Sequence, residues 1–424
     1  MISKFLLEEI LLGQQDELEA KRSAKLCLRQ EEALIDLESP QAQVVIGVRR
    51  SGKSTLCFQA LEHAGVRYAY VDFDDERLMG IDASQLNDLL EVLYKIYGDF
   101  NYLFLDEIQD VAGWHLFVNR LLRTGMYVIV TGSNAKLLSG ELATHLTGRS
   151  KEIHLYPFSF AEYCHLKGVE TQRMTTKTRG LCRAAFDTYM HEGGFPELQC
   201  IDNKLIYVNG LVDNILKRDI EQRYKVAYRE TFEQLAHHLL NVSPTKVVAT
   251  DLAETFHIKS DHTVKNYISF LCQAFLLVNV RKYSRKSKVR ITQEKVYAVD
   301  TSLMNQRRDA LSGENLGWRL ETLVLVQLMR RCKMHGWDLY YLSERSGECD
   351  FLVCNGYTVL QAIQVSYDIS HPKTRNREIA GLLMAHKQTG CENLLLLTDH
   401  DHEDISINGL NIQIRPVYEW SLSE

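Results

Sequence analysis

The sequence lacks the features that mark a secreted, disulfide-rich or membrane-spanning protein. Its ten cysteines are scattered, none forms a C-x-x-C pair, and the closest two are Cys349 and Cys354. Such cysteines are typical of buried, reduced thiols. Acidic residues follow the short apolar stretch at the N-terminus, without the basic start or cleavage site of a signal peptide. Because no apolar run reaches the length of about 18 residues that a membrane helix needs, we expect a cytoplasmic protein.

A strong net charge is also missing. The 424 residues include 49 basic and 55 acidic side chains, which leaves a net charge of -6. A balance of this size gives no overall attraction to nucleic acid or to an anionic membrane, so any site for a polyanion must be a local patch. The length exceeds what one compact core holds and predicts about two to four domains.

Four apolar runs predict the core of the first half of the chain. They are VVIGV at 44–48, YAYVDF at 68–73, YLFLDE at 102–107 and YVIVTGS at 127–133, and helical segments separate them. Continuous apolar strands that alternate with helices are typical of a parallel sheet covered on both faces. After Lys151 we expect the strands to stop and residues 158–242 to be mostly helical. Residues after 301 return to a mixed α/β pattern, with a helix at 316–334 and strands near Leu339, Cys349, Val359 and Leu394.

A phosphate-binding pattern follows the first of these strands. The octapeptide GVRRSGKS at 47–54 matches G-x-x-x-x-G-K-[ST] and precedes a predicted helix. Glycines let the backbone turn its amides toward phosphate oxygens, and the helix N-terminus adds positive partial charge. We expect Lys53 to pair with the β- and γ-phosphates of ATP and the Ser54 hydroxyl to bind Mg²⁺. The full set of candidate nucleotide-binding residues is Gly47, Val48, Arg49, Arg50, Ser51, Gly52, Lys53, Ser54 and Thr55.

Two acidic residues end the strand at 102–107, in a pattern that resembles the Walker B motif. We expect Asp106 to hold Mg²⁺ through water and Glu107 to polarise the attacking water as a general base. The alternative is a pair of acidic residues that only faces solvent at a strand end.

Polar residues after the fourth strand are further candidates. If this strand lies next to the first, Asn134 takes the sensor-1 position between the two Walker motifs, with Ser133 as the close alternative. Arg149, in THLTGRS, is either an arginine finger that reaches the γ-phosphate of a neighbouring subunit or a surface arginine.

The order of GVRRSGKST, LFLDEIQD, VTGSN, LTGRS, LYPFSFAEY and GGFPE resembles one family over residues 43–397. It is that of prokaryotic AAA+-type ATPases which join a P-loop core to a winged helix and an uncharacterised C-terminal domain related to restriction-endonuclease folds. The resemblance implies an α/β ATPase fold and ATP binding. The expected domains are an N-terminal helical segment (1–38), the ATPase core (39–157), a helical lid or connector (158–242), a winged helix (243–300) and the endonuclease-like domain (301–424).

A basic segment lies in the expected winged helix. Residues 250–256 and 261–275 resemble a helix-turn-helix with Ser260 or Asp261 as the N-cap of the second helix, and two strands follow as a hairpin wing. A wing that binds DNA needs cations for phosphate contacts. The alternatives are a protein-interaction module and a solvated basic hairpin. The candidate DNA-binding residues are Lys265, Arg281, Lys282, Arg285, Lys286, Lys288 and Arg290.

The last domain resembles a metal-dependent nuclease only in part. Glu321 in a predicted helix and Asp350 in a predicted strand fit that pattern, but its E-x-K motif is replaced by Gln364, Val365 and Ser366. Without the second carboxylate and the lysine, metal-assisted hydrolysis loses a ligand and the group that assists the attacking water, so we expect no nuclease activity.

These observations lead to one function and one alternative. We expect a Mg²⁺-dependent ATPase that works as a homo-oligomer and couples ATP turnover to binding or remodelling DNA with little sequence specificity. The alternative is a nucleotide-controlled signalling switch whose downstream domains bind protein.

Overall fold

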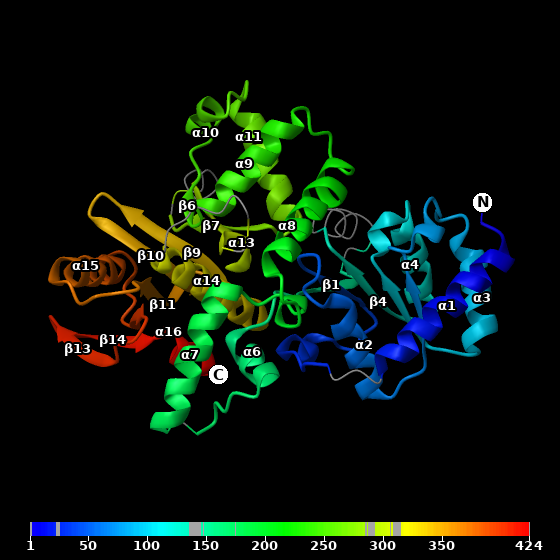
Figure 1. The fold of residues 1–424 in the computed structure, drawn as a ribbon, viewed down its shortest axis with the longest axis horizontal. Helices are drawn as coiled ribbons and strands as arrows, with labels where there is room; N and C mark the ends of the chain where they lie inside the picture. Colours follow the sequence, from blue (N-terminus) through cyan, green and yellow to red (C-terminus); the bar gives the residue numbers. More distant parts are fainter. Residues whose placement is uncertain are drawn as a thin grey trace. The chain divides into compact units, whose positions relative to one another are not determined.

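A computed structural model describes residues 2–22, 26–134, 146, 148–173, 175–284, 286, 293–305, 307 and 315–423. The chain forms two compact units, residues 1–155 and residues 156–424 (Figure 1). Within the described part of the chain, no helix has both the length and the apolar character needed to cross a membrane.

The first unit is built on a five-stranded parallel sheet with the strand order β2-β3-β4-β1-β5. The strands are β1 (Ala42–Ile46), β2 (Tyr68–Asp72), β3 (Tyr102–Asp106), β4 (Tyr127–Gly132) and β5 (Ser150–His154). The four apolar runs therefore form strands as predicted, and the α/β class is confirmed. Since β4 lies between β1 and β3, the condition set for the sensor-1 position is met.

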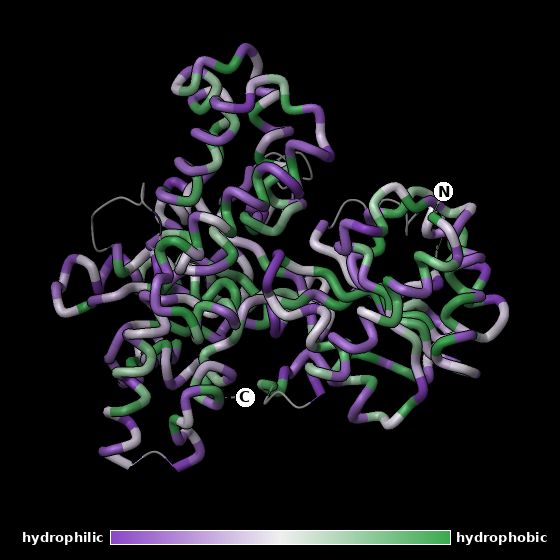
Figure 2. Tube along the Cα trace, turned by 45° about the vertical axis from the view of Figure 1, so that its right-hand side comes forward, coloured by the Kyte–Doolittle hydropathy of each residue, from purple (hydrophilic) through white to green (hydrophobic). Residues whose placement is uncertain are grey.

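Helices cover both faces of this sheet, with α2 on one side and α3 and α4 on the other (Figure 1). Most residues of the central strands are hydrophobic and buried, as burial on both faces requires (Figure 2). The N-terminal helix packs against α3 and β2 through buried residues such as Leu7 and Leu11. The helices of this unit are α1 (Lys4–Arg22), α2 (Lys53–Ala64), α3 (Leu86–Tyr97) and α4 (Trp114–Arg123), with 3-10 turns at Gln30–Leu34, Glu76–Leu78 and Ile108–Asp110.

The expectation that strands stop after Lys151 was wrong. Strand β5 pairs in parallel with β1 over five residues, from Ala42 with Ser150 to Ile46 with His154. It lies at an edge of the sheet, and Ile153 is its one buried residue. An edge position does not require an apolar sequence, and the segment SKEIH has no continuous apolar run. An edge strand with polar residues on its open side is easily missed in a sequence.

The second unit begins with helices and continues into a nine-stranded mixed sheet. The helices are α6 (Phe160–Lys167), α7 (Thr176–Glu192), α8 (Lys204–Asn214), α9 (Arg229–Asn241), α10 (Ala249–Thr255), α11 (Asp261–Gln273), α13 (Ser302–Asn305), α14 (Leu316–His335), α15 (Pro372–Thr389) and α16 (Val417–Leu422), with a π-helical stretch at Ile215–Glu221 and a 3-10 turn at Glu197–Gln199. The strands are β6 (Thr245–Lys246), β7 (Leu277–Lys282), β8 (Glu294–Ala298), β9 (Asp338–Glu344), β10 (Gly347–Asn355), β11 (Thr358–Val365), β12 (Leu394–Thr398), β13 (Glu403–Ile407) and β14 (Leu410–Pro416).

The strands expected for a wing belong to the same sheet as those of the C-terminal segment. The strand order is β13-β14-β12-β11-β10-β9-β7-β8-β6, and β7 pairs in parallel with β9 at Arg281 with Tyr340 and Lys282 with Tyr341. Hydrogen bonds on both sides of β7 exclude an isolated hairpin. The expected segments 243–300 and 301–424 are therefore joined by a continuous sheet.

The GGFP turn is explained by a close approach to the end of β8. Gly193 has a φ of 79° and Gly194 donates its amide to Asp300 Oδ2 at 2.8 Å. A Cβ at Gly193 would collide with the Asp300 carboxylate, and a Cβ at Gly194 with the Phe158 carbonyl. Only glycine fits both positions.

Candidate functional site

The phosphate-binding pattern forms the expected tight loop between β1 and α2. Arg50 and Gly52 have φ values of 69° and 95°, so the backbone turns through the left-handed region on both sides of Ser51. A Cβ at Gly47 would collide with the Leu155 carbonyl, which explains the glycine at this end of the loop. Alternation of right- and left-handed residues ahead of a helix N-terminus directs backbone amides to one point, and this arrangement binds anions.

Lys53, the first residue of α2, is buried at the end of this loop, with 4% of its surface exposed. Its ammonium group donates to the Val48 carbonyl at 3.3 Å and lies 3.5 Å from Glu107 Oε1. The other oxygen of that carboxylate accepts from Gln109 Nε2 at 2.5 Å and from the amide of Ser133 at 3.3 Å. The structure thus brings the predicted phosphate-binding lysine and the predicted base together.

Asp106 ends β3 with its carboxylate fully engaged by hydroxyl groups. Ser54 Oγ donates to Oδ1 at 2.9 Å, the Thr131 hydroxyl donates to the same oxygen, and the Tyr70 hydroxyl donates to Oδ2 at 3.2 Å. Burial and the charge of Glu107 raise the pKa of Asp106, while the hydrogen bonds from Thr131 and Ser54 oppose that rise. The pairing of Ser54 with Asp106 is the oxygen-donor arrangement that a small hard cation such as Mg²⁺ prefers.

Glu107 is held in an uncommon backbone conformation. Its φ and ψ are 51° and 38°, in the left-handed region that residues other than glycine rarely adopt. The Glu107 amide donates to Thr131 Oγ1 at 3.0 Å, so the neighbouring strand supports this conformation. Unusual backbone geometry of this kind is common at functional sites.

Further acidic residues, from the end of β2 and the loop after it, approach this site. Burial, and next the charge of Asp106, raise the pKa of Asp72 to about 7. Asp74 lies 3.2 Å from Arg49, which places one of the two loop arginines in an ion pair. The run VDFDD at 71–75 carries these acids, and no sequence motif assigns them a role.

The segment before β1 contacts the back of the phosphate-binding loop. Arg29 is buried, donates from Nη1 to the Ser51 carbonyl at 3.0 Å, and lies 3.9 Å from Glu31. No sequence motif pointed to this residue, because a lone arginine between helical segments has no pattern of its own.

The remaining candidates of the ATPase core are less closely connected to this site. Ser133 contributes its amide to Glu107, and Asn134 is fully buried beside it. Arg50 is exposed, whereas Val48 and Ser51 are buried and Thr55 is half-buried in α2. Arg149 is exposed on the surface and donates to Asn119 Oδ1 at 2.8 Å.

The candidate DNA-binding residues are spread over α11, β7 and the segment after it. Ser260 caps α11 as expected, and Lys265 is exposed but pairs with Asp261 at 2.7 Å. Arg281 and Lys282 lie on β7, and Lys286 is exposed. Arg285, Lys288 and Arg290 lie outside the described residues.

The C-terminal unit contains a lysine that the incomplete nuclease pattern did not reveal. Lys295 of β8 donates to Glu321 Oε1 at 2.7 Å and lies 3.5 Å from Glu348 and 4.0 Å from Asp350. Burial opposes its charge, but these carboxylates raise the pKa of Lys295 above its ordinary value. In the described part of the chain, no three histidine, cysteine or acidic side chains converge to hold a metal ion. The carboxylates of Glu321, Glu348 and Asp350 lie around the Lys295 ammonium group.

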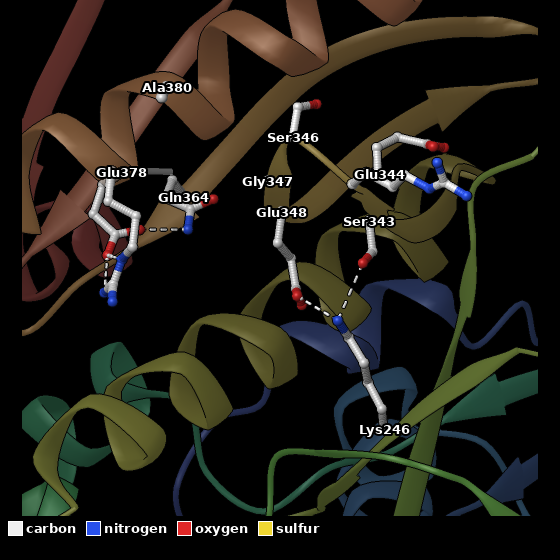
Figure 3. Close-up of a pocket in the computed structure, with 11 residues that line it drawn as sticks. Lys246, Ser343, Glu344, Ser346, Gly347, Glu348, Gln364, Glu378 and Ala380 are labelled. Atoms are coloured by element: carbon white, nitrogen blue, oxygen red, sulfur yellow. Dashed lines mark hydrogen bonds and ion pairs between the residues drawn. The ribbon is translucent and has the colours of Figure 1, made fainter.

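A cavity of about 520 Å³ lies beside this cluster. Figure 3 shows Lys246 directed toward Ser343 and Glu348 on one wall, and Gln364 directed toward Glu378 on another. Each of the two glutamates also has a cationic partner, Lys246 for Glu348 and Arg377 for Glu378. The cavity wall is thus largely neutralised by its own ion pairs.

Comparison with known proteins covers the whole chain. Residues 39–164 match the AAA domain family and residues 183–314 match a domain of unknown function, DUF8612. The chain is 31% identical to the uncharacterized protein MJ1544 of Methanocaldococcus jannaschii, over 99% of this chain and 96% of that protein. It is also 31% identical to an uncharacterized protein of Haemophilus influenzae, over 90% of this chain and 94% of that one.

Two solved structures show remote likeness. The Walker-type ATPase PABY2304 of Pyrococcus abyssi has a TM-score of 0.43 and 14% identity, and the match covers 66% of this chain and 95% of that one. DnaA of Aquifex aeolicus, solved with AMPPCP, has a TM-score of 0.25 and 15% identity, over 63% of this chain and 88% of that one.

Proposed function

The chain belongs to the same family as the uncharacterized protein MJ1544 of Methanocaldococcus jannaschii, and its residues 39–164 match the AAA domain, so we propose that it is a Mg²⁺-dependent ATPase that couples turnover to DNA. The AAA-type P-loop core accounts for nucleotide binding and hydrolysis as a general activity. The proposal adds the metal, the roles of single residues and the DNA partner.

The roles follow from the positions of the side chains. The loop amides between Gly47 and Ser54 bind the phosphates, and Lys53 neutralises their charge. Ser54 and Asp106 would hold Mg²⁺, and the bound metal would supply positive charge to stabilise the charge that develops on the leaving phosphate. Glu107 orients the attacking water and takes its proton.

One observation carries this proposal: the charged ends of β3 and α2 form a single connected network. Lys53 lies 3.5 Å from Glu107, and Ser54 lies 2.9 Å from Asp106, although about 50 residues separate each pair. A phosphate at the loop therefore meets the Lys53 ammonium and the Ser54 hydroxyl, with Glu107 beside Lys53. A purely structural pair of strand-end acids would not need the buried lysine, the strained glutamate and the serine at one point.

The direct test is ATP hydrolysis by the wild-type protein and by Lys53→Ala, with Mg²⁺ and with EDTA. We expect turnover only in the wild type and only with Mg²⁺. Nucleotide binding measured with a fluorescent ATP analogue separates failure to bind from failure to react. Turnover that persists in Lys53→Ala would contradict the assignment.

DNA is proposed as the partner because of the cations that follow α11. Arg281, Lys282 and Lys286 lie within six residues, and the exposed Lys265 is on the preceding helix. Lys265 is partly neutralised by Asp261, so we expect the β7 segment to contribute more. A basic patch of this kind neutralises DNA phosphates and gives salt-dependent binding.

The test compares Arg281→Ala/Lys282→Ala/Lys286→Ala with the single control Lys387→Ala, since Lys387 is exposed on α15. We expect the triple variant to bind DNA more weakly. The slope of the logarithm of affinity against the logarithm of salt concentration should become shallower by about 1 for each lost phosphate contact. Binding to duplex, forked and single-stranded DNA is followed by mobility shift, with ATP turnover measured in the same samples.

The alternative is a nucleotide-controlled signalling switch whose second unit binds protein. It predicts slow turnover, tight retention of nucleotide and no salt-dependent DNA affinity.

Arg149 is proposed to act on the nucleotide of a neighbouring subunit, and its exposure is compatible with that role. In a homo-oligomer, the turnover rate per subunit should rise with protein concentration. Arg149→Ala should abolish this rise.

A further inference from the structure

Thr131 belongs to the segment VTGSN, and its hydroxyl contacts both acidic residues of the proposed ATPase site. Thr131 is on β4, with β3 on one side and β1 on the other, and none of its surface is exposed. Residues Val130 and Leu105 are register partners, so Thr131 follows directly beside Asp106. Its partner on the other side is Val45, two residues before the phosphate-binding loop.

The hydroxyl of Thr131 makes two hydrogen bonds whose directions are determined by its chemistry. The Glu107 amide donates to Oγ1 at 3.0 Å, which leaves the single hydroxyl proton for Asp106 Oδ1. A hydroxyl has one donor and two acceptor positions, so it can make both bonds at once. Valine has the same shape and can make neither, whereas serine can make both.

Both bonds act on features that hydrolysis requires. The bond to the Glu107 amide supports the left-handed backbone that directs the glutamate side chain toward Lys53. The bond to Asp106 is to the same carboxylate oxygen that accepts from Ser54, so it holds that carboxylate in place beside Ser54. A single side chain thus contacts both residues that carry the acidic groups.

We propose that Thr131 is a positioning residue that couples the metal-holding carboxylate of Asp106 to the general base Glu107. This inference rests on the proposed ATPase function. It assigns to Thr131, rather than to Asn134 or Ser133 alone, the contact of β4 with the Walker acids. Outer-shell partners of a metal site are worth about 10- to 100-fold in metal affinity or activity.

The experiment compares Thr131→Val with Thr131→Ser. For Thr131→Val we expect kcat to fall by about 10- to 100-fold, with a higher Mg²⁺ concentration for half-maximal turnover. The affinity for a fluorescent ATP analogue in EDTA should stay within about twofold of wild type, because the loop amides and Lys53 are intact. Thr131→Ser should restore both kcat and the Mg²⁺ midpoint.

Three results would overturn the inference. The first is an unchanged kcat and Mg²⁺ midpoint in Thr131→Val. The second is a serine variant as impaired as the valine variant. The third is a loss of nucleotide affinity in EDTA, in Thr131→Val, that is as large as its loss of kcat. The second result would mean that the hydroxyl does not account for the role of Thr131, and the third that the substitution disturbs the phosphate-binding loop itself. Thermal unfolding of both variants shows whether either is misfolded.

Failure of the ATPase proposal gives a different result. If the wild-type protein binds nucleotide but does not hydrolyse it, the Mg²⁺ dependence of analogue affinity still tests Thr131 through Asp106. A midpoint that does not differ between wild type and Thr131→Val then refutes the positioning role independently of turnover.

Discussion

The ammonium group of Lys53 lies 3.5 Å from the carboxylate of Glu107, and both side chains are largely buried. A phosphate group that binds Lys53 therefore competes with Glu107 for the same ammonium. Nucleotide binding should separate this pair and free the glutamate for water. The two residues thus connect occupancy of the loop with availability of the base.

The variant Glu107→Gln tests this relationship. We expect kcat to fall by a factor of about 100 to 10,000, because the neutral amide cannot take a proton. ATP affinity should rise, because the amide no longer competes for Lys53 and no longer repels phosphate. Equilibrium binding and steady-state turnover measure the two effects, and weaker ATP binding would contradict the competition.

Asp72 should make stability depend on pH. Its pKa is about 7 in the folded protein against an ordinary value of 3.8, so between these values the folded state holds the proton more tightly. Stability should fall as pH rises from about 4 to about 7 and stay lower above that. Asp72→Asn removes this loss, so the variant should be more stable than wild type by about 1 to 3 kcal/mol at pH 8, and similar near pH 4.

Asp75 provides the matched control with the opposite sign. A hydrogen bond from Arg77 lowers the pKa of Asp75 to about 2. The stability from this group is present above its ordinary pKa and is lost as pH falls through about 2. Asp75→Asn should therefore lower the free energy of unfolding at pH 8, whereas Asp72→Asn should raise it. Thermal unfolding in EDTA, from pH 4 to pH 8, compares the two variants.

Lys295 should be needed for the stability of the second unit. Lys295→Met leaves Glu321 and Glu348 without their shared ammonium group, and loss of one partner in a buried ion pair costs about 3 to 5 kcal/mol. Lys295→Met/Glu321→Gln removes both charges and should recover part of this loss. Chemical unfolding of wild type and both variants measures the effect, and equal stability of the two variants would argue against charge as the cause.

Gly47 should tolerate no side chain. A methyl group there would enter the space of the Leu155 carbonyl, so Gly47→Ala must move the start of the loop or the end of β5. We expect a loss of about 1 to 3 kcal/mol together with weaker nucleotide binding. Gly65→Ala is a useful contrast, because its φ of 64° makes alanine unfavourable while no neighbouring atom obstructs it. That variant should lose stability but keep nucleotide affinity.

Local pattern was sufficient for the phosphate-binding loop and the apolar strands, and for the cap of α11 at Ser260. These depend on neighbours in the chain: glycine spacing, continuous apolar runs and a hydroxyl before a helix. The apolar pattern did not predict strand β5, because its edge position leaves most of its residues partly exposed. The acids at the ends of β2 and β3 were visible, but only Asp106 and Glu107 were given roles.

The sequence by itself determined the α/β class, the loop at 47–54 and the acidic pair that ends β3, because each is a short-range pattern with a strong steric or chemical cause. Only the tertiary structure decided which distant groups meet. Thr131 reaches Asp106 through the strand order, Arg29 reaches Ser51 through the path of the chain, and Lys295 reaches Glu321 across a shared sheet. Such contacts depend on strand order and register, which arise from burial over the whole unit and leave no mark in any single segment.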